Sequence, residues 1–561
     1  MKKKSVLTMS LIVAFFLLSG IGTIVHAAAI EVTTTVDNVA GSLRAAITTA
    51  NTNNEDDTIY LPAGIYILGG KPGEDANAGG DLDINTSHSI TISGGGPGLT
   101  IIDGIEADRV LHIINGTVSI TGVTFRNGNF KCVIFEREDG SKYVDQEHGG
   151  GIYNSGTLIL NNCKISKNSS KNGCFVCYGG GGCASCSGSH GGGIYNTGTL
   201  ELKNCTISEN NSGHRTYAWL SHTGSGDGGG IYNTGTLYMS DCVVKDNITG
   251  FDGGFGGGIY NFETGTMIIE RCTVSDNKAN DGGWERHVDI GTGGGSGGGI
   301  FNRGKANLSF CTITNNCTGE GGFGDWVAGF AGNGGGISNS GEFILENSTI
   351  TANTTGDWNA GAGGGISSSG EMTITNCTIS ENATGNGIDD NTGEHFSGSG
   401  GGIFVSRGKV TLTSCTVCDN RTGQENIEQM SGHGGGIYVA NEGKCFLKNT
   451  IVANNQVYPG NQGPDCWGAL NSQGYNLIEN TNNCAINGEL TGNITGVDPL
   501  LAPLADNGGL TLTHALLINS PAIDAGTSAG ISGDQRGCTR PVDIPGIFNV
   551  NDGADIGAYE L

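Results

Sequence analysis

The motif G-G-G-I-[YFS]-x recurs nine times between residues 149 and 450 of this chain. Each copy is followed by an alternating apolar stretch and then by C-x-[IV]-x-x-N or a close variant. The copies begin 28 to 42 residues apart, at Gly149, Gly191, Gly228, Gly256, Gly297, Gly334, Gly363, Gly400 and Gly434. Such a period is typical of stacked units, none of which can bury its apolar face alone. We therefore expect a solenoid.

Within one unit, the apolar residues alternate in three runs that are too short for helices. The first unit places them at Ile152, at Leu158 and Leu160, and at Cys163 and Ile165. Asn, Ser and Gly separate the runs and supply the turns. Three short strands per coil predict an all-β chain that folds as a parallel β-helix.

The N-terminus has the pattern of a secretory signal peptide. Lys2, Lys3 and Lys4 precede an apolar run, and small residues follow it at Ala27 to Ala29. A retained anchor helix is the alternative, but serine and glycine interrupt the run. We expect residues 1–27 to be removed and the mature chain to be secreted, without a transmembrane helix.

The chain is acidic, with a formal net charge of -26. This charge argues against nucleic acid as a partner, because phosphates would be repelled. Acidic polysaccharides would be repelled as well unless cations intervened, so calcium is a candidate cofactor where Asp, Asn and turn carbonyls gather. The alternative is a solvated acidic surface.

Seven cysteines occupy one position of the repeat, two residues before a core Ile or Val, and this position predicts an inward-facing ladder. Cysteine there would act as a small buried apolar residue, and disulfides between neighbouring coils are the alternative. Ser348 and Thr450 replace cysteine in two coils. The ladder cysteines are Cys163, Cys205, Cys242, Cys272, Cys311, Cys377 and Cys415.

A single insertion after the first unit holds four further cysteines with C-x2-C-x5-C-x2-C spacing. They are Cys174, Cys177, Cys183 and Cys186. In an exported chain two local disulfides are the favoured interpretation. A zinc site is the alternative, with His148 and His190 as further ligands, although structural zinc sites usually separate the two CxxC pairs more widely.

Cys466 and Cys484 follow the repeat array, and we expect them to form a disulfide. Cys132, Cys317, Cys418, Cys445 and Cys538 have no predicted role.

The long insertions all fall between the closing asparagine of one unit and the next GGG. Stacked coils would therefore place them at one corner, as a wall of loops. This wall would carry four of the five tryptophans, which are suited to stacking on sugar rings: Trp219, Trp284, Trp326 and Trp358. The alternative is that the loops bury these rings among themselves.

Catalytic candidates are few. Asp389–Asp390 and the triplet around His433 resemble the DD and GHG elements of polygalacturonases, which share the β-helix fold. The preceding NTD and following RIK of that family are missing here. The alternative is that these residues are loop acids and a histidine before a repeat glycine.

An asparagine closes each unit, and we expect these residues to form a stacked amide ladder that binds the turn backbone. The series is Asn168, Asn210, Asn247, Asn277, Asn316, Asn353, Asn382 and Asn420.

The repeats resemble those of secreted right-handed parallel β-helix proteins, including the polymorphic outer-membrane proteins. Residues 41–61, with an S-L-R-x-A-I core, resemble the N-terminal segment of bacterial β-helix surface proteins. Residues 498–561, with DQRG and DIGAYE, resemble the choice-of-anchor Q domain. These resemblances imply export and surface display, and they carry over no catalytic residue.

We therefore expect a signal peptide (1–27), an N-terminal cap with the first coils (28–125), a repeat array (126–457) and a C-terminal choice-of-anchor Q-like domain (458–561). The leading hypothesis is a monomeric adhesive protein that binds a polysaccharide or cell-surface glycan. A pectin-type polysaccharide lyase or glycoside hydrolase is the first alternative, and a structural envelope component is the second.

Overall fold

The computed structural model describes residues 28–73, 75–129, 134–136, 142–144, 148–177, 183–214, 217–218, 221–222, 224–283, 291–322, 329–387, 398–423, 432–458 and 462–561. The expected signal peptide lies outside these ranges.

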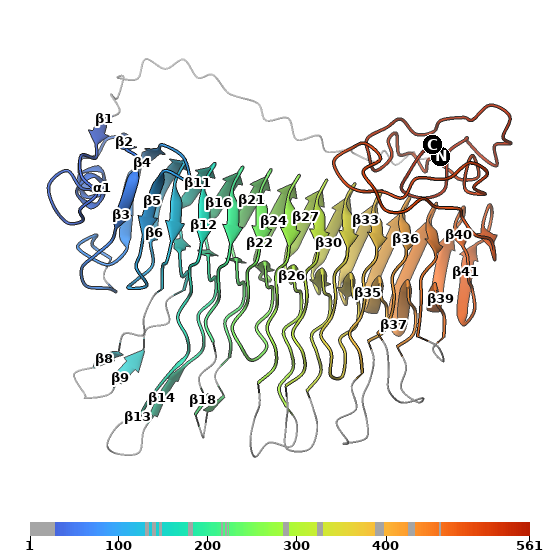
Figure 1. Ribbon diagram of the computed structural model, residues 1–561, viewed down its shortest axis with the longest axis horizontal. Helices are drawn as coiled ribbons and strands as arrows, with labels where there is room; N and C mark the ends of the chain where they lie inside the picture. The colour runs from blue at the N-terminus through green and yellow to red at the C-terminus, as the bar shows by residue number, and fades with distance from the viewer. Residues whose placement is uncertain are drawn as a thin grey trace, which may run out of the picture.

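The chain folds as a right-handed parallel β-helix, as the repeat predicts (Figure 1). One coil consists of β10 (Ile152–Asn154), β11 (Thr157–Asn161) and β12 (Lys164–Ser166). The first two strands belong to a 22-stranded sheet and the third to a 14-stranded sheet. Each strand pairs in parallel with its counterpart one coil away, for example Ile152 with Ile194 and Ile165 with Ile207.

The strands of the other coils follow this plan. The first strands are β15 (Ile194–Asn196), β20 (Ile231–Asn233), β23 (Ile259–Asn261), β26 (Ile300–Asn302), β29 (Ile337–Asn339) and β32 (Ile366–Ser368). The second strands are β16 (Thr199–Lys203), β21 (Thr236–Ser240), β24 (Thr266–Glu270), β27 (Lys305–Ser309), β30 (Glu342–Glu346) and β33 (Glu371–Thr375). In the last repeats they merge into β35 (Ile403–Thr413) and β37 (Ile437–Lys448). The third strands are β17 (Thr206–Ser208), β22 (Val243–Lys245), β25 (Thr273–Ser275), β28 (Thr312–Thr314), β31 (Thr349–Thr351), β34 (Thr378–Ser380), β36 (Thr416–Cys418) and β38 (Ile451–Ala453).

The first coils and a helix close the N-terminal end. Their elements are β1 (Ala28–Glu31), α1 (Leu43–Thr52), β2 (Asp57–Leu61), β3 (Gly64–Ile67), β4 (Leu82–Gly94), β5 (Thr100–Asp103), β6 (Leu111–Thr121) and β7 (Thr124–Arg126). Ser42 caps α1, since its Oγ accepts a hydrogen bond from the Ala45 N–H at 3.2 Å. Leu43 and Ile47 are buried in the core. The S-L-R-x-A-I segment is therefore a helical cap.

The three glycines of the motif allow neighbouring coils to approach closely. Gly149 has a φ of +77°, and a Cβ there would lie 2.4 Å from the Ile152 carbonyl oxygen. A Cβ on Gly150 would lie 2.4 Å from the carbonyl oxygen of Gly192 in the next coil. A side chain at Gly149 would clash within its own coil, and one at Gly150 would push neighbouring coils apart, which explains why the motif recurs.

The ladder cysteines are buried free thiols, as expected. Besides filling a small space in the core, they form hydrogen bonds with the backbone. The Cys242 Sγ accepts a hydrogen bond from the Cys205 N–H at 3.3 Å and donates to the Ser240 carbonyl at 3.2 Å. In the coil with serine, Ser348 Oγ accepts from the Cys311 N–H at 3.0 Å and donates to the Glu346 carbonyl. The position therefore requires a small side chain that both accepts and donates.

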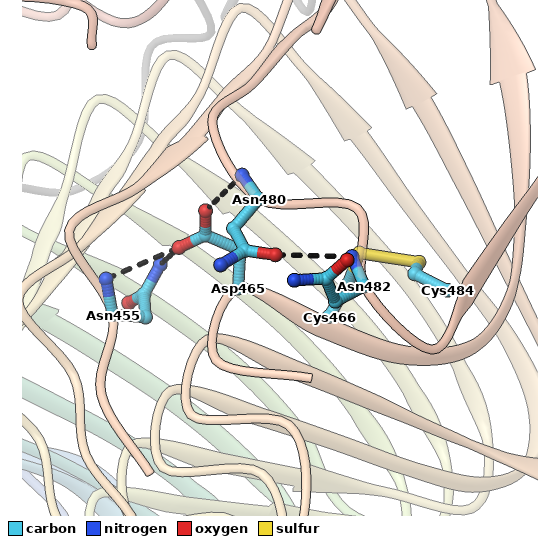
Figure 2. The surroundings of a disulfide bond; sticks show 6 residues. All are labelled: Asn455, Asp465, Cys466, Asn480, Asn482 and Cys484. Carbon is cyan, nitrogen blue, oxygen red and sulfur yellow. Dashed lines mark hydrogen bonds between the residues drawn. A yellow bond between two sulfur atoms is a disulfide. The ribbon is translucent and has the colours of Figure 1, made fainter. Parts of the chain in front are cut away.

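The closing asparagines form the expected ladder. In each step the side-chain amide donates to the Oδ1 of the next asparagine, for example from Asn247 to Asn277 at 2.9 Å. The ladder ends on a carboxylate: Asp465 Oδ1 accepts from Asn455, and its Oδ2 accepts from the Asn480 N–H (Figure 2). A second ladder, which we did not predict, joins Asn154, Asn196, Asn233, Asn261, Asn302 and Asn339.

The solenoid continues beyond residue 457, so the expected start of the C-terminal domain lies too early. The last coils are built from β39 (Cys466–Gln473), β40 (Leu477–Ile478), β41 (Cys484–Glu489) and β42 (Ile494–Thr495). These coils lack the repeat motif, yet β39 pairs in parallel with both β37 and β41. Cys466 and Cys484 form the expected disulfide between β39 and β41 (Figure 2).

Residues 499–561 leave the solenoid and return over the outer face of the 14-stranded sheet, above β31 to β38 (Figure 1). The outward-facing Thr378 and Thr416 are buried there, whereas the equivalent Thr206 and Thr273 are half-buried. Gln535 of the DQRG segment joins the two layers. Its Nε2 donates to Thr349 Oγ1 at 3.0 Å, and its Oε1 accepts from Thr378 Oγ1 at 2.7 Å.

Three hairpins project from one side of the solenoid (Figure 1). They are β8 (Ile134–Glu136) with β9 (Lys142–Val144), β13 (Cys174–Cys177) with β14 (Cys183–Cys186), and β18 (Tyr217–Ala218) with β19 (Ser221–His222). In the second hairpin Cys174 lies opposite Cys186, and Cys177 lies opposite Cys183. The Cα register thus pairs the four cysteines two by two.

Candidate functional site

A groove runs along the solenoid at the corner where the asparagine ladder ends each unit. The residue after each ladder asparagine forms a single parallel bridge with its counterpart in the next coil. Five consecutive members of this column form the floor of the groove: Lys278, Cys317, Thr354, Ala383 and Arg421. Coils in a parallel sheet are about 4.8 Å apart, so this floor extends over about 19 Å.

Side-chain length creates the groove. The middle positions carry the short side chains of Cys317, Thr354 and Ala383, whereas the ends carry Lys278 and Arg421. The resulting open groove has a volume of about 600 Å³. Its length and openness suit an extended polymer strand rather than a small enclosed ligand.

A row of polar side chains lies beside the floor, four residues after each ladder asparagine. It comprises Asp281, Glu320, Asp357 and Asn386. The row is held by backbone bonds: Asp281 Oδ1 accepts from the Glu320 N–H at 3.0 Å, and Asp357 Oδ1 accepts from the Asn386 N–H. These bonds place one carboxylate or amide on each successive coil.

The charges in the groove are mixed. Lys278 Nζ lies 2.9 Å from Asp281 Oδ1, so this cation is paired. Partial burial raises the pKa of Glu320, and the carboxylates of Asp281 and Asp357 raise it further. The exposed Arg421 makes no ion pair within the described chain. Because the bases lie at the two ends and the acids lie on the coils between or beside them, the groove offers donors and acceptors without strongly favouring an anionic ligand.

Buried threonines support the floor. Thr355 Oγ1 donates to the Gly361 carbonyl at 2.7 Å and accepts from the Gly385 N–H at 2.8 Å, and Thr384 does the same with Gly398 and Gly423. The series ends at Thr422, whose Oγ1 is buried and has no hydrogen-bond partner among the described residues. Thr422 is a lining residue of the groove, but its hydroxyl oxygen has almost no exposed surface.

One aromatic side chain lines the groove: Tyr458, at one end, is 36% exposed. Of the predicted tryptophan wall, Trp358 directly follows the groove residue Asp357 in the sequence and is half-buried, with a φ of +60°, but it is not one of the lining residues. Trp219, Trp284 and Trp326 lie outside the described residues.

The catalytic candidates from the sequence are not brought together among the described residues. Asp389 and Asp390 lie outside them. His433 stacks on Trp467 with ring centroids 4.2 Å apart, and its Nδ1 accepts from the Gln462 N–H at 3.3 Å. In seven of the nine repeats the residue before GGG supplies a side-chain acceptor to the next coil, which is a structural role.

His148 and His190 occupy the same column and stack as expected, with centroids 5.1 Å apart. The His148 Nδ1 accepts from the His190 N–H at 3.2 Å, and the His190 Nδ1 accepts from the Asp227 N–H at 2.9 Å. Burial lowers the pKa of His148 to about 3 and that of His190 to about 4. Both rings are therefore neutral acceptors, and neither belongs to a group of three ligand atoms within the described chain.

Two other groups place three metal-ligand atoms within 4.8 Å of one another. The first contains Asp75, Asp83 and His112, whose Nδ1 lies 3.3 Å and 3.4 Å from the two carboxylates. The Arg109 guanidinium lies 3.5 Å from the same Nδ1, and this cation opposes a metal ion there. The second contains Cys418, Asp419 and His514.

The sequence analysis missed the groove residues Glu320, Asp357 and Arg421. Their signal was a fixed offset from the ladder asparagines, one residue for Arg421 and four for the two acids. That signal indicates only that these residues share a face, because the repeat does not show which side chains are short enough to leave a groove.

No helix among the described residues is long and apolar enough to cross a membrane.

No known protein family and no curated protein matches the chain at the level of sequence. Solved structures with a similar course of the chain include an alginate lyase in complex with G6, with 11% identity, 89% of this chain and 93% of that chain covered, and a TM-score of 0.36. The pectate lyase Pel9A matches with 12% identity, 95% of both chains covered and a TM-score of 0.33. The A-module of a mannuronan C-5 epimerase from Azotobacter vinelandii matches with 11% identity, 81% and 92% covered, and a TM-score of 0.30.

Proposed function

We propose that this protein is a secreted or cell-surface β-helix that binds a polysaccharide strand in the groove between Lys278 and Arg421. The single observation that carries the proposal is the groove itself, which is open, about 600 Å³ in volume and lined mainly by polar groups. An extended carbohydrate fits such a surface because each sugar unit presents hydroxyl groups to donors and acceptors and a ring face to aromatic side chains.

The groove chemistry favours a neutral glycan. Lys278 is already paired with Asp281, and Glu320 and Asp357 add negative charge. Arg421 can donate to sugar oxygens, whereas Glu320 and Asp357 can accept from hydroxyls. Tyr458 offers a ring face at one end. A polyanion would meet an acidic protein with a net charge of -26.

The test is retention of the mature chain on a panel of neutral and acidic polysaccharides, with and without calcium. We expect the double variant Arg421→Ala with Tyr458→Ala to bind at least about tenfold more weakly, a loss of about 1.4 kcal/mol. The matched control is Arg407→Ala with Tyr238→Ala, since both of these residues are exposed on the 22-stranded sheet. Equal binding by the groove variant and the parent would overturn the proposal.

The tryptophan wall is tested separately. Trp284→Ala combined with Trp326→Ala is expected to weaken binding if the insertions extend the groove. Unchanged binding by this variant, together with a loss in the groove variant, would confine the site to the floor and its row of polar residues.

Hydrolysis of the glycan is a second candidate function, and one observation favours it. Glu320 and Asp357 occupy equivalent positions on adjacent coils, about 4.8 Å apart, and the pKa of Glu320 is raised. Retaining glycosidases use two carboxyl groups about 5 Å apart, one of them with a raised pKa. Release of reducing ends that Glu320→Gln and Asp357→Asn each abolish would support this function. Unsaturated ends would indicate a lyase instead, and retention without cleavage would leave binding alone.

A further inference from the structure

The coil that carries β36 departs from the repeat at one outward-facing position. Val417 points into the core, so Thr416 and Cys418 on either side of it face outward, beneath residues 499–561. The other eight repeats have Ser, Thr, Lys or Ala at the position of Cys418: Ser166, Ser208, Lys245, Ser275, Thr314, Thr351, Ser380 and Ala453. A thiol therefore occurs where the repeat needs none.

His514 of the C-terminal segment lies against this position. Its Nε2 is 2.9 Å from Ser380 Oγ and 3.9 Å from Asp419 Oδ2. Its Nδ1 lies 2.7 Å from the Ala502 carbonyl oxygen, which can only accept, so Nδ1 carries the proton. The tautomer is thus fixed with the Nε2 lone pair directed at Ser380 and Asp419. Metal-ligating histidines usually have such a carbonyl partner on the other ring nitrogen.

We propose that Cys418, Asp419 and His514 bind a zinc-class divalent ion that fastens the C-terminal segment to the solenoid. The Sγ, carboxylate oxygen and Nε2 atoms all lie within 4.8 Å of one another. Zinc bonds of about 2.0 to 2.3 Å in tetrahedral geometry place two ligand atoms about 3.3 to 3.6 Å apart. The 3.9 Å between Nε2 and Asp419 Oδ2 needs a closure of only a few tenths of an ångström.

The surroundings favour a cation. The charged groups that act on Cys418 are the carboxylates of Asp419, Glu381 and Asp465. In the other three-ligand group, by contrast, Arg109 lies beside the histidine. Asp419 also lines a groove of about 450 Å³ with Glu479 and Asp498, and this groove gives an ion a route to the site.

Binding of the metal ion releases one proton from the site. The ion forms a bond to Cys418 Sγ, and the thiol proton is released to water. The ion also takes the Nε2 lone pair of His514, which Ser380 Oγ contacts in its absence. Two solenoid residues and one residue of the returning segment then share the ion, so the segment becomes harder to detach.

The experiment uses the full mature chain, treated with a chelator and titrated with Co²⁺ and with Zn²⁺. We expect one Co²⁺ per chain with a thiolate-to-cobalt charge-transfer absorption. Cys418→Ser should lose this absorption and bind zinc more than about 100-fold more weakly, because even the loss of groups that only orient ligands costs about 10 to 100-fold. Serine is the residue that the preceding coil carries at this position, Ser380, so the variant is expected to fold.

The matched control is Cys415→Ser, three residues away in the ladder, where another coil has Ser348. It should keep the absorption and the affinity. Asp419→Asn, with an exposed side chain, is the second variant and should weaken binding while leaving the fold intact. In the parent and in Cys415→Ser, zinc should slow hydrogen exchange in residues 499–561.

Three outcomes would overturn the proposal. The parent could show no thiolate-to-cobalt absorption, Cys418→Ser could bind as the parent does, or exchange in residues 499–561 could be unaffected by zinc. The group around His112 contains no sulfur and therefore cannot produce the charge-transfer absorption, so metal bound there would not be mistaken for the proposed site.

Discussion

His190 accepts a hydrogen bond at its Nδ1 from the backbone N–H of Asp227, one coil further along, at 2.9 Å. The same side-chain column uses Asn333 in a later coil, where Oδ1 accepts from the Ala362 N–H at 2.7 Å. Histidine and asparagine thus perform the same task, but only histidine can lose it by protonation.

Replacement of His148 and His190 by Asn should therefore flatten the acid side of the stability profile. Their folded pKa values, about 3 and about 4, lie below the unfolded value of 6.5. The unfolded chain binds more protons in this window, so stability falls as the pH drops from 6.5 towards 4. When the pH falls from 7 to 5, each histidine should lower the free energy of unfolding of the parent by about 2 kcal/mol.

The measurement is thermal unfolding of parent and double variant at several pH values. Burial raises the pKa of Asp227 to about 7, which works in the opposite direction, but Asp227 is present in both proteins. The variant loses the ring stacking of His148 on Tyr195 and should be less stable at pH 7. The quantity to compare is the slope of stability against pH in each protein. Equal slopes in the two proteins would contradict the prediction.

The cysteine ladder should tolerate serine better than valine. Cys242→Ser retains an acceptor for the Cys205 N–H and a donor for the Ser240 carbonyl. Cys242→Val leaves a buried N–H without its acceptor, at a cost of about 1 to 3 kcal/mol. Chemical denaturation of the two variants beside the parent is the measurement. A valine variant at least as stable as the serine variant would show that the position selects size alone.

Gln535 should be essential for docking of the C-terminal segment. Its side chain contacts Thr349 and Thr378 on two coils and Thr511 in its own segment. Gln535→Ala leaves the buried Thr378 hydroxyl without its acceptor and removes a donor from the Thr349 and Thr511 hydroxyls, and we expect a loss of about 2 to 4 kcal/mol in local stability. Limited proteolysis should then cut residues 499–561 before the solenoid. The exposed Gln473→Ala is the control, and identical cleavage of the two variants would argue against this role.

Peptide mapping without reduction should recover links between Cys174 and Cys186 and between Cys177 and Cys183, besides the Cys466–Cys484 disulfide. Directly opposed residues of an antiparallel pair lie about 4.5 to 5.5 Å apart at Cα, within the range that a disulfide spans. The ladder cysteines should be recovered as free thiols. Links between Cys174 and Cys177, or zinc held by this hairpin, would contradict the register-based assignment.

Much of the solenoid was predictable, because the ladder residues recur at the same position of the repeat, with Ser348 and Thr450 as the exceptions in the cysteine ladder. The cysteine and asparagine ladders follow from residues such as Cys242 and Asn247, which recur at a fixed offset from GGG. Cys466 and Cys484 lie outside the repeat array, and this position made them candidates for a disulfide with each other. The end of the solenoid was placed wrongly because β39 and β41 pair without the motif.

The groove and the proposed metal site could not be predicted in this way. The groove depends on the lengths of five side chains that lie far apart in the sequence, from Lys278 to Arg421. The Cys418 group depends on where the returning segment docks, and His514 carries no sequence signal for that position.

The sequence alone determined the coil and its cysteine and closing-asparagine ladders, because these rest on hydrogen bonds and burial that repeat with the motif. The tertiary structure alone decided which face residues 499–561 cover, which thiol meets His514 and where the surface is hollowed. Those outcomes depend on contacts between segments that have no repeating relation to one another, so no local pattern encodes them.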